Sequence, residues 1–260
     1  MARKHSNTDL AFNAMILVGG RGTRLQSVVS DLPKPMAPVA GRPFLEWLIL
    51  SLRGQGIRRL ILCTGHMGEL IEARFGDGRS LDVKVSYCRD PFPLGTAGSI
   101  KHALDLVQGQ RFFVLNGDSY CRVDFGRLAK AHLVRRAGAT IWAVRQDDCR
   151  RYGSVDVNEQ GAVLAFHEKS LDARAGLVNA GVYVLEKRTA MSIPSNMAVS
   201  LENEVFPQMI GSGLYAEIGG GPFIDIGVPE AYASAHVFFA AEGRYVTTAN
   251  NMYAGRAKLR

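Results

Sequence analysis

The chain has 260 residues, of which 47% are hydrophobic, and it carries a formal net charge of +7. This hydrophobic content excludes an intrinsically disordered chain, and the length suits one sizeable α/β domain or two small ones. No apolar run is long enough to span a bilayer, and the basic N-terminal stretch MARKHSNTDL lacks a following apolar segment. We therefore expect neither membrane contact nor a secretory signal.

The cysteines, the histidines and the net charge exclude further classes of function. The four cysteines, Cys63, Cys88, Cys121 and Cys149, show no CxxC spacing, and the six histidines show no metal-ligand spacing. We expect three of the four cysteines to be buried thiols in a reducing compartment, together with a cytoplasmic location and no zinc site. The positive charge suits nucleic acid or small anionic substrates. Since no predicted helix carries a basic stripe interleaved with aromatic residues, phosphorylated ligands are favoured.

The first predicted strand, residues 14–18, leads into the glycines Gly19, Gly20 and Gly22. Glycine permits a tight turn and lets main-chain N–H groups approach a ligand, so such a loop after a strand suits phosphate oxygens. The pattern matches neither the dinucleotide fingerprint nor the Walker loop. A purely structural turn is the alternative interpretation.

Three cations accompany these glycines: Arg21, Arg24 and Lys34. Pro33 and Pro35 flank Lys34 and keep this segment out of a helix, which fixes the lysine backbone. Fixed cations beside exposed amides favour a polyanion. We therefore predict a phosphate site in preference to a structural turn.

Predicted strands and helices then alternate along the first half of the chain, which indicates an α/β fold with a doubly wound, mostly parallel, Rossmann-like sheet. Ligands of such sheets bind at the carboxyl ends of the strands, where the glycine loop lies. The predicted strands are 57–63, 83–87, 112–115 and 140–144. The predicted helices are 43–53, 67–75, 96–107 and 124–137, with Pro43 at a first helical position and Asp124 as an N-cap.

Two more strand ends carry notable residues. Asn116, Gly117 and Asp118 follow the strand FFVL, where a carboxylate can hold Mg²⁺ against phosphate oxygens. An Asx turn explains the same residues equally well. The stretch PLGTAG, residues 93–98, places small residues at a helix start, where a flat ring can pack on the backbone. Capping by Thr96 is the alternative there.

The pattern changes after Val144 to a smaller β-rich subregion. Strands 152–157 and 163–167 are predicted to form a hairpin around a turn at 158–161, and a further strand spans 177–185. Glu168 and Lys169 lie between them and, taken alone, are typical of solvated surface charge. The remaining elements are a helical stretch 201–211 with a proline interruption, strands 214–218 and 223–226, and a final helix 229–241 that packs on the sheet or on another subunit.

The sequence GGRGTRL at 19–25, followed by LPKPM at 32–36, resembles the signature of the sugar-1-phosphate nucleotidylyltransferases. The resemblance covers roughly residues 14–240. It implies an enzyme that joins a nucleoside triphosphate to a sugar 1-phosphate and releases pyrophosphate. We accordingly expect a flexible N-terminal tail at 1–12, one nucleotidyltransferase domain at 13–245 and a C-terminal tail at 246–260.

The resemblance implies roles at the nucleotide end of the site. Arg24, Lys34 and Asp118 would be catalytic, with Lys34 neutralising charge on the α-phosphoryl group. Asp118 would hold Mg²⁺ together with Asp225, whose Asp-Ile-Gly sequence resembles a second metal element. The implied nucleotide-binding set is Leu17, Gly19, Gly20, Arg21, Gly22, Thr23, Gly95, Thr96, Ala97 and Gly117, and the base reader would include the segment 89–96.

A second group of motifs implies a binding site for the sugar phosphate. The family's Tyr-Gly, Glu-Lys and Asn-x-Gly elements resemble residues 152–153, 168–169 and 179–181 of this chain. Lys169 would pair with the phosphate, while Glu168 and Asn179 would contact sugar hydroxyls. Gly153 would let the sugar approach the backbone. The implied sugar-phosphate-binding set is Gly153, Glu168, Lys169, Asn179 and Gly181.

Taken whole, the chain most resembles compact guanylyltransferases that act on heptose 1-phosphate for polysaccharide assembly, in a capsule or another surface glycan. We therefore predict GTP and D-glycero-α-D-manno-heptose 1-phosphate as substrates. The alternatives are mannose 1-phosphate, a UTP-, dTTP- or CTP-using relative, and a non-catalytic regulatory subunit that binds a sugar nucleotide. Retention of Lys34, Asp118, Lys169 and Asp225 favours an enzyme. A homodimer is expected only from the general symmetry of soluble oligomers.

Overall fold

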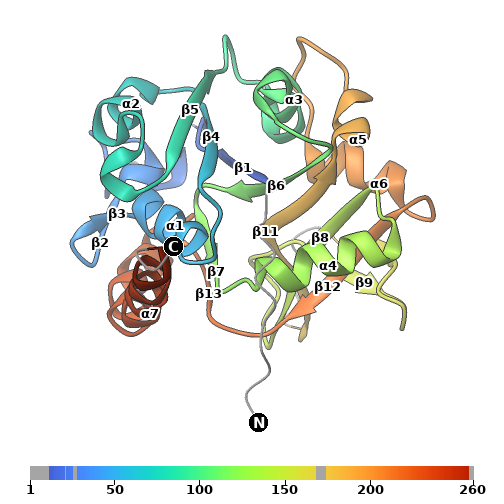
Figure 1. The fold of residues 1–260 in the computed structure, drawn as a ribbon. Helices are drawn as coiled ribbons and strands as arrows, with labels where there is room; N and C mark the ends of the chain where they lie inside the picture. Colours follow the sequence, from blue (N-terminus) through green and yellow to red (C-terminus); the bar gives the residue numbers. More distant parts are fainter. Residues whose placement is uncertain (1–11, 21, 26–27, 168–173, 258–260) are drawn as a thin grey trace.

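The computed structural model describes residues 12–20, 22–25, 28–167 and 174–257, with the backbone alone for 247–257. Its centre is a parallel arrangement in which β1 (Asn13–Leu17) lies between β6 (Arg111–Asn116) and β4 (Arg59–Thr64), and β5 (Lys84–Arg89) follows at the edge (Figure 1). These four strands coincide with predicted apolar runs. Because parallel strands end at the same edge, their carboxyl ends gather the loops that follow them.

The second part of the same sheet is mixed in direction. β11 (Gly176–Glu186) runs antiparallel to β6 and to β8 (Ala139–Gln146), and β12 (Leu214–Gly219) runs parallel to β8. β9 (Ser154–Val157) and β10 (Val163–His167) form the expected antiparallel hairpin beside β11. The predicted α/β fold with a mostly parallel sheet and a β-rich subregion is confirmed.

Helices cover both faces of the sheet, because the buried strands are apolar on both sides. Met15 and Ile16, neighbours on β1, belong to different core clusters on opposite faces. One cluster includes α1 (Phe44–Arg53), α2 (Gly68–Phe75) and α4 (Phe125–Arg135). The other includes α3 (Gly95–His102), α5 (Lys187–Met191) and the π-helix η5 (Leu201–Val205), which continues into α6 (Phe206–Met209).

Short elements complete the fold. They are the 3₁₀ helices η1 (Thr23–Leu25), η2 (Lys34–Met36), η3 (Arg79–Leu81) and η4 (Leu104–Leu106), the ribbon of β2 (Pro38–Val39) with β3 (Arg42–Pro43), and the ribbon of β7 (Ser119–Cys121) with β13 (Phe223–Asp225). Two predicted boundaries shift. Pro43 is the N-cap of α1, and the helix predicted over 96–107 ends at His102 before η4.

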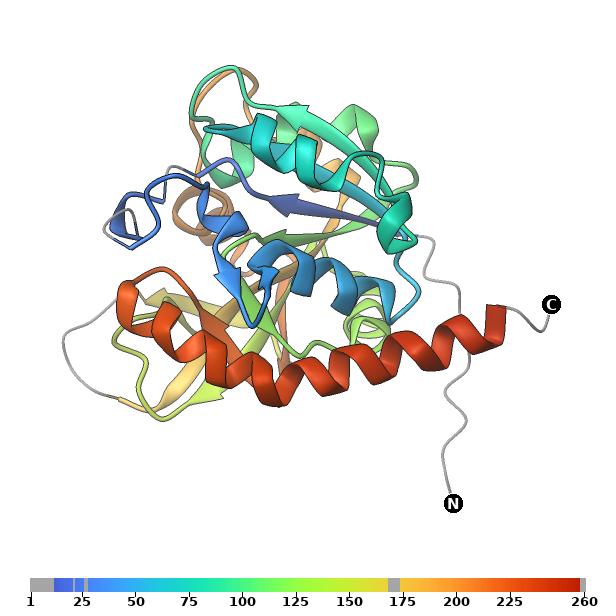
Figure 2. The ribbon, with the colours of Figure 1, turned by 90° about the vertical axis from the view of Figure 1, so that its left-hand side faces the viewer.

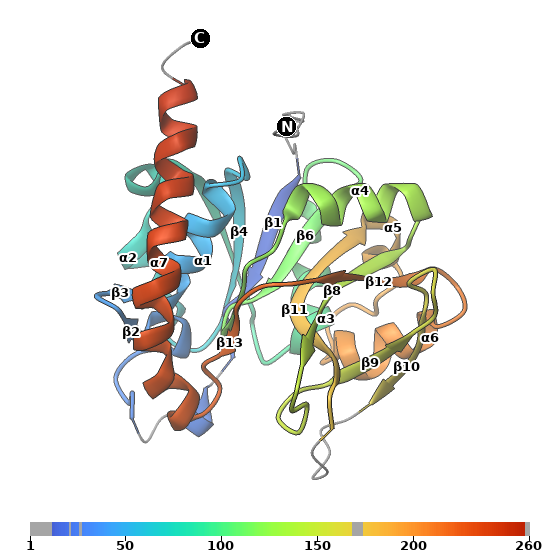
Figure 3. The same cartoon turned by 90° about the horizontal axis from the view of Figure 1, so that it is seen from below.

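Helix α7 (Pro229–Ala257) is much longer than predicted. Figures 2 and 3 show its C-terminal end extending past the rest of the fold. The expected helix end at Ala241 is therefore wrong, because the helix continues to Ala257, into the residues expected to form a C-terminal tail. Residues 230–257 contain no proline to stop the helix, and Phe239 stacks on Trp47 of α1 with ring centroids 5.0 Å apart. The Tyr120 hydroxyl donates to buried Glu242 at 2.7 Å, which ties α7 to β7.

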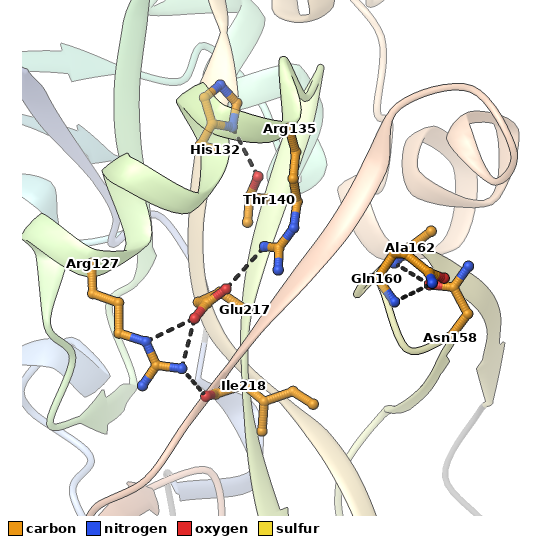
Figure 4. Close-up of polar contacts among 9 residues, drawn as sticks. All are labelled: Arg127, His132, Arg135, Thr140, Asn158, Gln160, Ala162, Glu217 and Ile218. Carbon is orange, nitrogen blue, oxygen red and sulfur yellow. Dashed lines mark hydrogen bonds and ion pairs between the residues drawn. The ribbon is translucent and has the colours of Figure 1, made fainter.

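Side-chain ion pairs fasten α4 to the far strand of the sheet (Figure 4). Glu217 on β12 accepts from Arg127 at 2.7 Å and from Arg135 at 2.9 Å, both on α4. In the nearby hairpin turn, Asn158 Oδ1 accepts from the main-chain N–H of Ala162 at 2.9 Å. The ion pairs thus fix β12 to α4, while the Asn158 bond closes the hairpin turn.

Within the described ranges, no helix is long and apolar enough to cross a membrane. The four cysteines are free thiols: Cys63, Cys121 and Cys149 are buried, and Cys88 is half-buried. Burial raises the pKa of Cys121 to about 12, so this thiol remains protonated and unreactive near neutral pH.

Candidate active site

The glycine loop follows β1, and the loop at residues 116–118 follows the neighbouring strand β6. The two loops are in contact where they begin. The carbonyl oxygen of Leu17, at the end of β1, accepts a hydrogen bond from Gly117 N–H at 3.0 Å. A Cβ added at Gly117 would lie 2.6 Å from the same oxygen, so only glycine permits this approach. The structure thus brings both predicted loops to one edge of the sheet.

Gly22 and Lys34 are in contact across the loop. Gly22 has a φ of +60°, and a Cβ there would lie 2.9 Å from the Cβ of Lys34. The position therefore requires glycine for its conformation and for the space that the lysine stem occupies. Thr23 and Arg24 follow in η1 with exposed side chains. Arg21 lies outside the described residues.

Lys34 reaches the first of two neighbouring carboxylates. Its Nζ lies 2.6 Å from Oδ2 of Asp118, and the lysine side chain is only 9% exposed. The ribbon of β7 and β13 sets Asp225 opposite Ser119. The Ser119 hydroxyl is 3.3 Å from Oδ1 of Asp118 and 3.4 Å from Oδ2 of Asp225. Lysine, serine and both aspartates therefore form one continuous cluster.

Gly227 keeps the space beside this cluster open. Its N–H donates to Oδ1 of Asp225. A Cβ at Gly227 would lie 2.5 Å from that oxygen and 3.3 Å from the Nζ of Lys34. A side chain at this position would fill the cradle that the carboxylate and the ammonium share.

The donor set suits Mg²⁺. Mg²⁺ prefers oxygen ligands and is usually held by one or two carboxylates together with substrate phosphates and water. Among the described residues, no group of three or more His, Cys, Asp or Glu side chains gathers that could form a complete protein cage. Asp118 and Asp225 therefore fit a cation that completes its coordination with phosphate oxygens.

A third carboxylate lies on the other side of the glycine loop. Asp90 follows β5, and its Oδ2, which accepts from the Ser99 hydroxyl, is 3.4 Å from the position that a Cβ would take at Gly19. Its Oδ1 is buried and has no hydrogen-bond partner among the described residues. Burial raises the pKa of Asp90, and the bond from Ser99 opposes that rise. Within the expected base-reading segment 89–96, the sequence did not single out this carboxylate.

The predicted base-binding residues of α3 pack against a distant segment. Gly95 has a φ of +69°, and a Cβ there would lie 2.5 Å from the carbonyl oxygen of Val199, which also accepts from Ala97 N–H at 2.9 Å. The Thr96 hydroxyl donates to Glu202 at 2.8 Å and accepts from Leu201 N–H at 2.7 Å. The side chain of Thr96 is thus committed to η5.

Three predicted sugar-phosphate residues lie close together, Gly153 immediately before β9 and Asn179 and Gly181 on β11, next to Asn116 at the end of β6. Asn179 N–H donates to the Gly153 carbonyl at 3.0 Å, and its Oδ1 accepts from Gly181 N–H at 2.9 Å. Gly181 has a φ of +70°, and a Cβ there would lie 2.9 Å from Nδ2 of Asn116. Glu168 and Lys169 lie outside the described residues.

Tyr183 and Glu202 link these two groups, and sequence reasoning missed both. Asn179 Nδ2 donates to the Tyr183 hydroxyl at 2.9 Å, and that hydroxyl donates to Glu202 at 2.9 Å. Burial raises the pKa of Tyr183 well above its ordinary value, so it stays a donor. Glu202 also binds Thr96, which is 106 residues away in the chain, so no local pattern could have revealed the pair.

Comparison with known proteins adds an independent finding. The family model described as "Nucleotidyl transferase" matches residues 13–242. A mannose-1-phosphate guanylyltransferase of Mycobacterium tuberculosis is 37% identical over 223 residues, which are 85% of this chain and 62% of that protein. This chain thus spans less than two thirds of that relative.

Two other similar proteins match along almost their whole length. A D-glycero-α-D-manno-heptose 1-phosphate guanylyltransferase of Aneurinibacillus thermoaerophilus is 36% identical, over 85% of this chain and 96% of its own. The crystal structure of HddC from Yersinia pseudotuberculosis complexed with GMP-PN superposes with a TM-score of 0.79 at 35% identity, over 88% of this chain and 99% of HddC.

Proposed function

Because the chain belongs to the nucleotidyl transferase family, we propose that it condenses GTP with D-glycero-α-D-manno-heptose 1-phosphate to give GDP-heptose and pyrophosphate. The observation that carries the proposal is the contact series Gly22, Lys34, Asp118 and Asp225, which joins a glycine loop, a fixed cation and two carboxylates at one sheet edge. The heptose is proposed from the similarity to heptose 1-phosphate guanylyltransferases at 36% and 37% identity, and mannose 1-phosphate, the substrate named for a relative at 37% identity, stays the alternative.

The reaction is an in-line displacement at the α-phosphorus of GTP. An oxygen of the sugar phosphate forms the new P–O bond, and the bond between the α-phosphorus and the bridging oxygen breaks to release pyrophosphate. The attacking oxygen is already anionic, so no general base is needed. The main obstacle is repulsion between two polyanions, which positioning and fixed positive charge overcome.

The chain's own groups divide this work between them. Main-chain N–H groups of residues 19–22 and the Arg24 guanidinium bind the β- and γ-phosphates, and Lys34 stabilises charge that grows on the α-phosphoryl oxygens. Asp118 and Asp225 would hold Mg²⁺, which supplies positive charge to the phosphates when bound. Glu168 and Lys169 are proposed as sugar-phosphate contacts from the sequence alone.

Asp90 supports the choice of guanine. A guanine base presents two adjacent donors, N1–H and the N2 amino group, whereas uracil and thymine present a single N3–H. The Asp90 carboxylate lies beside Gly19 and has an oxygen without a hydrogen-bond partner among the described residues. A carboxylate with a spare acceptor suits a base with two neighbouring donors.

The reaction takes place in the cytoplasm, where its nucleotide substrate is made, and the product serves the assembly of a capsule or another surface polysaccharide. A homodimer, and the absence of a nucleic-acid partner, stay predictions.

A substrate matrix tests the proposal. The purified full chain is incubated with Mg²⁺ and each of GTP, UTP, dTTP and CTP, paired with heptose 1-phosphate or mannose 1-phosphate, and pyrophosphate release is measured. We expect the highest kcat/KM for GTP with the heptose, and GDP-heptose as the product by mass spectrometry. Binding of GDP-sugars in a thermal-shift assay without pyrophosphate release from any pair would indicate a regulatory subunit instead.

A further inference from the structure

We propose that the ammonium of Lys34 and the divalent cation compete for the same carboxylates, so that the nucleotide-free protein binds the cation weakly and takes it up together with the triphosphate. The inference rests on the proposed function, because it assumes that Asp118 and Asp225 are the cation's ligands. It adds a second role for Lys34, as an internal counter-ion that nucleotide binding must displace.

The first observation is the place of the ammonium. Lys34 Nζ lies 2.6 Å from Oδ2 of Asp118, an ion-pair distance. The same nitrogen is 3.3 Å from the position that a Cβ would take at Gly227, and that position is 2.5 Å from Oδ1 of Asp225. The ammonium therefore forms an ion pair with Asp118 and lies near Asp225.

The second observation is that the lysine is held in this place. Its stem packs against Gly22, and its backbone follows Pro33 into η2, where the Ala37 N–H donates to the Lys34 carbonyl oxygen at 3.1 Å. The side chain is 9% exposed, so water screens its charge poorly. A cation bound to Asp118 would therefore lie close to a poorly screened ammonium.

The physical consequence is competition between the two cations. An ammonium at ion-pair distance from Oδ2 of Asp118 occupies part of that carboxylate and repels a divalent ion bound to it, so each cation weakens the binding of the other. A triphosphate in the glycine loop supplies new anionic oxygens, to which Lys34 can move. Asp118 is then free to bind the cation, and by linkage the cation in turn favours the nucleotide.

The test is Mn²⁺ binding to the nucleotide-free protein, measured by titration with electron paramagnetic resonance. Lys34→Gln removes the ammonium and keeps a polar side chain, while Lys84→Gln removes the same charge from exposed Lys84 on β5. We expect Lys34→Gln to bind Mn²⁺ about tenfold or more tightly than the unaltered chain, because a nearby positive charge is gone. Lys84→Gln should bind Mn²⁺ as the unaltered chain does.

A second variant and a second measurement test whether any gain in Mn²⁺ affinity arises at Asp118. Adding Asp118→Asn to Lys34→Gln should abolish the gain, and Mn²⁺ should raise the melting temperature of Lys34→Gln more than that of the unaltered chain. A gain in metal affinity on loss of a buried cation is not expected from general damage to the fold.

The outcomes separate this inference from the function on which it rests. Equal Mn²⁺ affinity in Lys34→Gln and the unaltered chain overturns the competition, even where pyrophosphate release depends on a divalent cation. Pyrophosphate release that EDTA leaves unchanged overturns the proposed metal role itself, and the inference with it. If Lys34→Gln binds Mn²⁺ more tightly and the double variant with Asp118→Asn keeps that higher affinity, Lys34 and the cation do not share the Asp118 carboxylate.

Discussion

Asp225 lies opposite Ser119 in the ribbon of β7 and β13, although 106 residues separate them in the chain. Ser119 immediately follows Asp118, so this strand pairing sets the two carboxylates side by side at the end of β6. The backbone repeats the link, since Ile226 N–H donates to the Asp118 carbonyl at 3.0 Å.

Replacement of Asp225 by asparagine should remove activity and leave the fold intact. The amide would keep the size of the side chain but lose the charge that balances Lys34 and a bound cation. We expect kcat for pyrophosphate release to fall on the order of a hundredfold to a thousandfold, as for other preorganised charge-stabilising groups. Asp118→Asn should match it, whereas Ser119→Ala should lose much less. Near-native turnover of Asp225→Asn with Mg²⁺ would contradict the metal role.

Gly227→Ala should impair the site through one methyl group. Its Cβ would lie 2.5 Å from Oδ1 of Asp225, closer than real Cβ contacts. We expect a loss of kcat of about tenfold or more, because small displacements of positioned groups are costly in rate. Gly220→Ala is the matched control, since a Cβ there meets nothing within 4 Å. Equal kcat values for the two variants would show that the cradle at Gly227 is not needed.

Thr96→Val should weaken GTP binding by loosening the start of α3, because the Thr96 hydroxyl is committed to η5. The hydroxyl of Thr96 joins the start of α3 to Glu202 and Leu201. Its loss leaves partly buried polar groups unpaired, at a cost of about 1–3 kcal/mol to the local structure. We expect a higher KM for GTP with a smaller change in kcat. Ser234→Ala, which removes an exposed hydroxyl from α7, should change neither constant.

Asp90→Asn should reduce selectivity for guanine. The variant keeps the shape of the side chain but replaces one acceptor oxygen with a donor, which faces the donors of guanine unfavourably. We expect the ratio of kcat/KM for GTP to that for UTP to fall by about tenfold or more, since unpaired polar groups in a base site are strongly selective. An unchanged ratio would remove Asp90 from base recognition.

Acid should destabilise the fold through His132. This side chain is 1% exposed, and burial lowers its pKa from the ordinary value, although Glu186 opposes the shift. Between the lowered folded pKa and the unfolded value the unfolded chain binds more protons, so stability is lost as pH falls below about 6.5. Urea unfolding at pH 7.5 and pH 5.5 measures the loss. His132→Gln should reduce the difference between the two pH values, and His236→Gln, at an exposed position, should leave it unchanged.

Much of the fold follows from local sequence. The apolar runs of β1, β4 and β6 and the turn residues between them predict a parallel sheet, and Asp124 caps α4 as expected by accepting from Arg127 N–H. A site that combines Gly22 and Lys34 could also be predicted, because the glycines and prolines of residues 19–35 that indicate it are close together in the sequence. The length of α7 was missed because its stability depends on packing against α1 and β7 rather than on its own composition.

The parts of the site that sequence reasoning missed are all long-range. Ser119 became notable only once β13 paired with β7, and Glu202 only once Thr96 reached it. The same holds for Asp90, whose carboxylate gains meaning from its approach to Gly19. Periodicity reports which face of an element is apolar, but it does not report which distant side chain will meet a given polar group.

The ribbon of β7 and β13 also bears on how the protein is made. During synthesis Asp118 leaves the ribosome well before Asp225, and α7, which covers β7 through Glu242 and Tyr120, follows later still. A nascent chain can therefore build its central strands while the two-carboxylate cluster is half finished. The cluster is complete only once β13 has emerged and paired with β7, so a chain that stops before Phe223 would lack the second carboxylate.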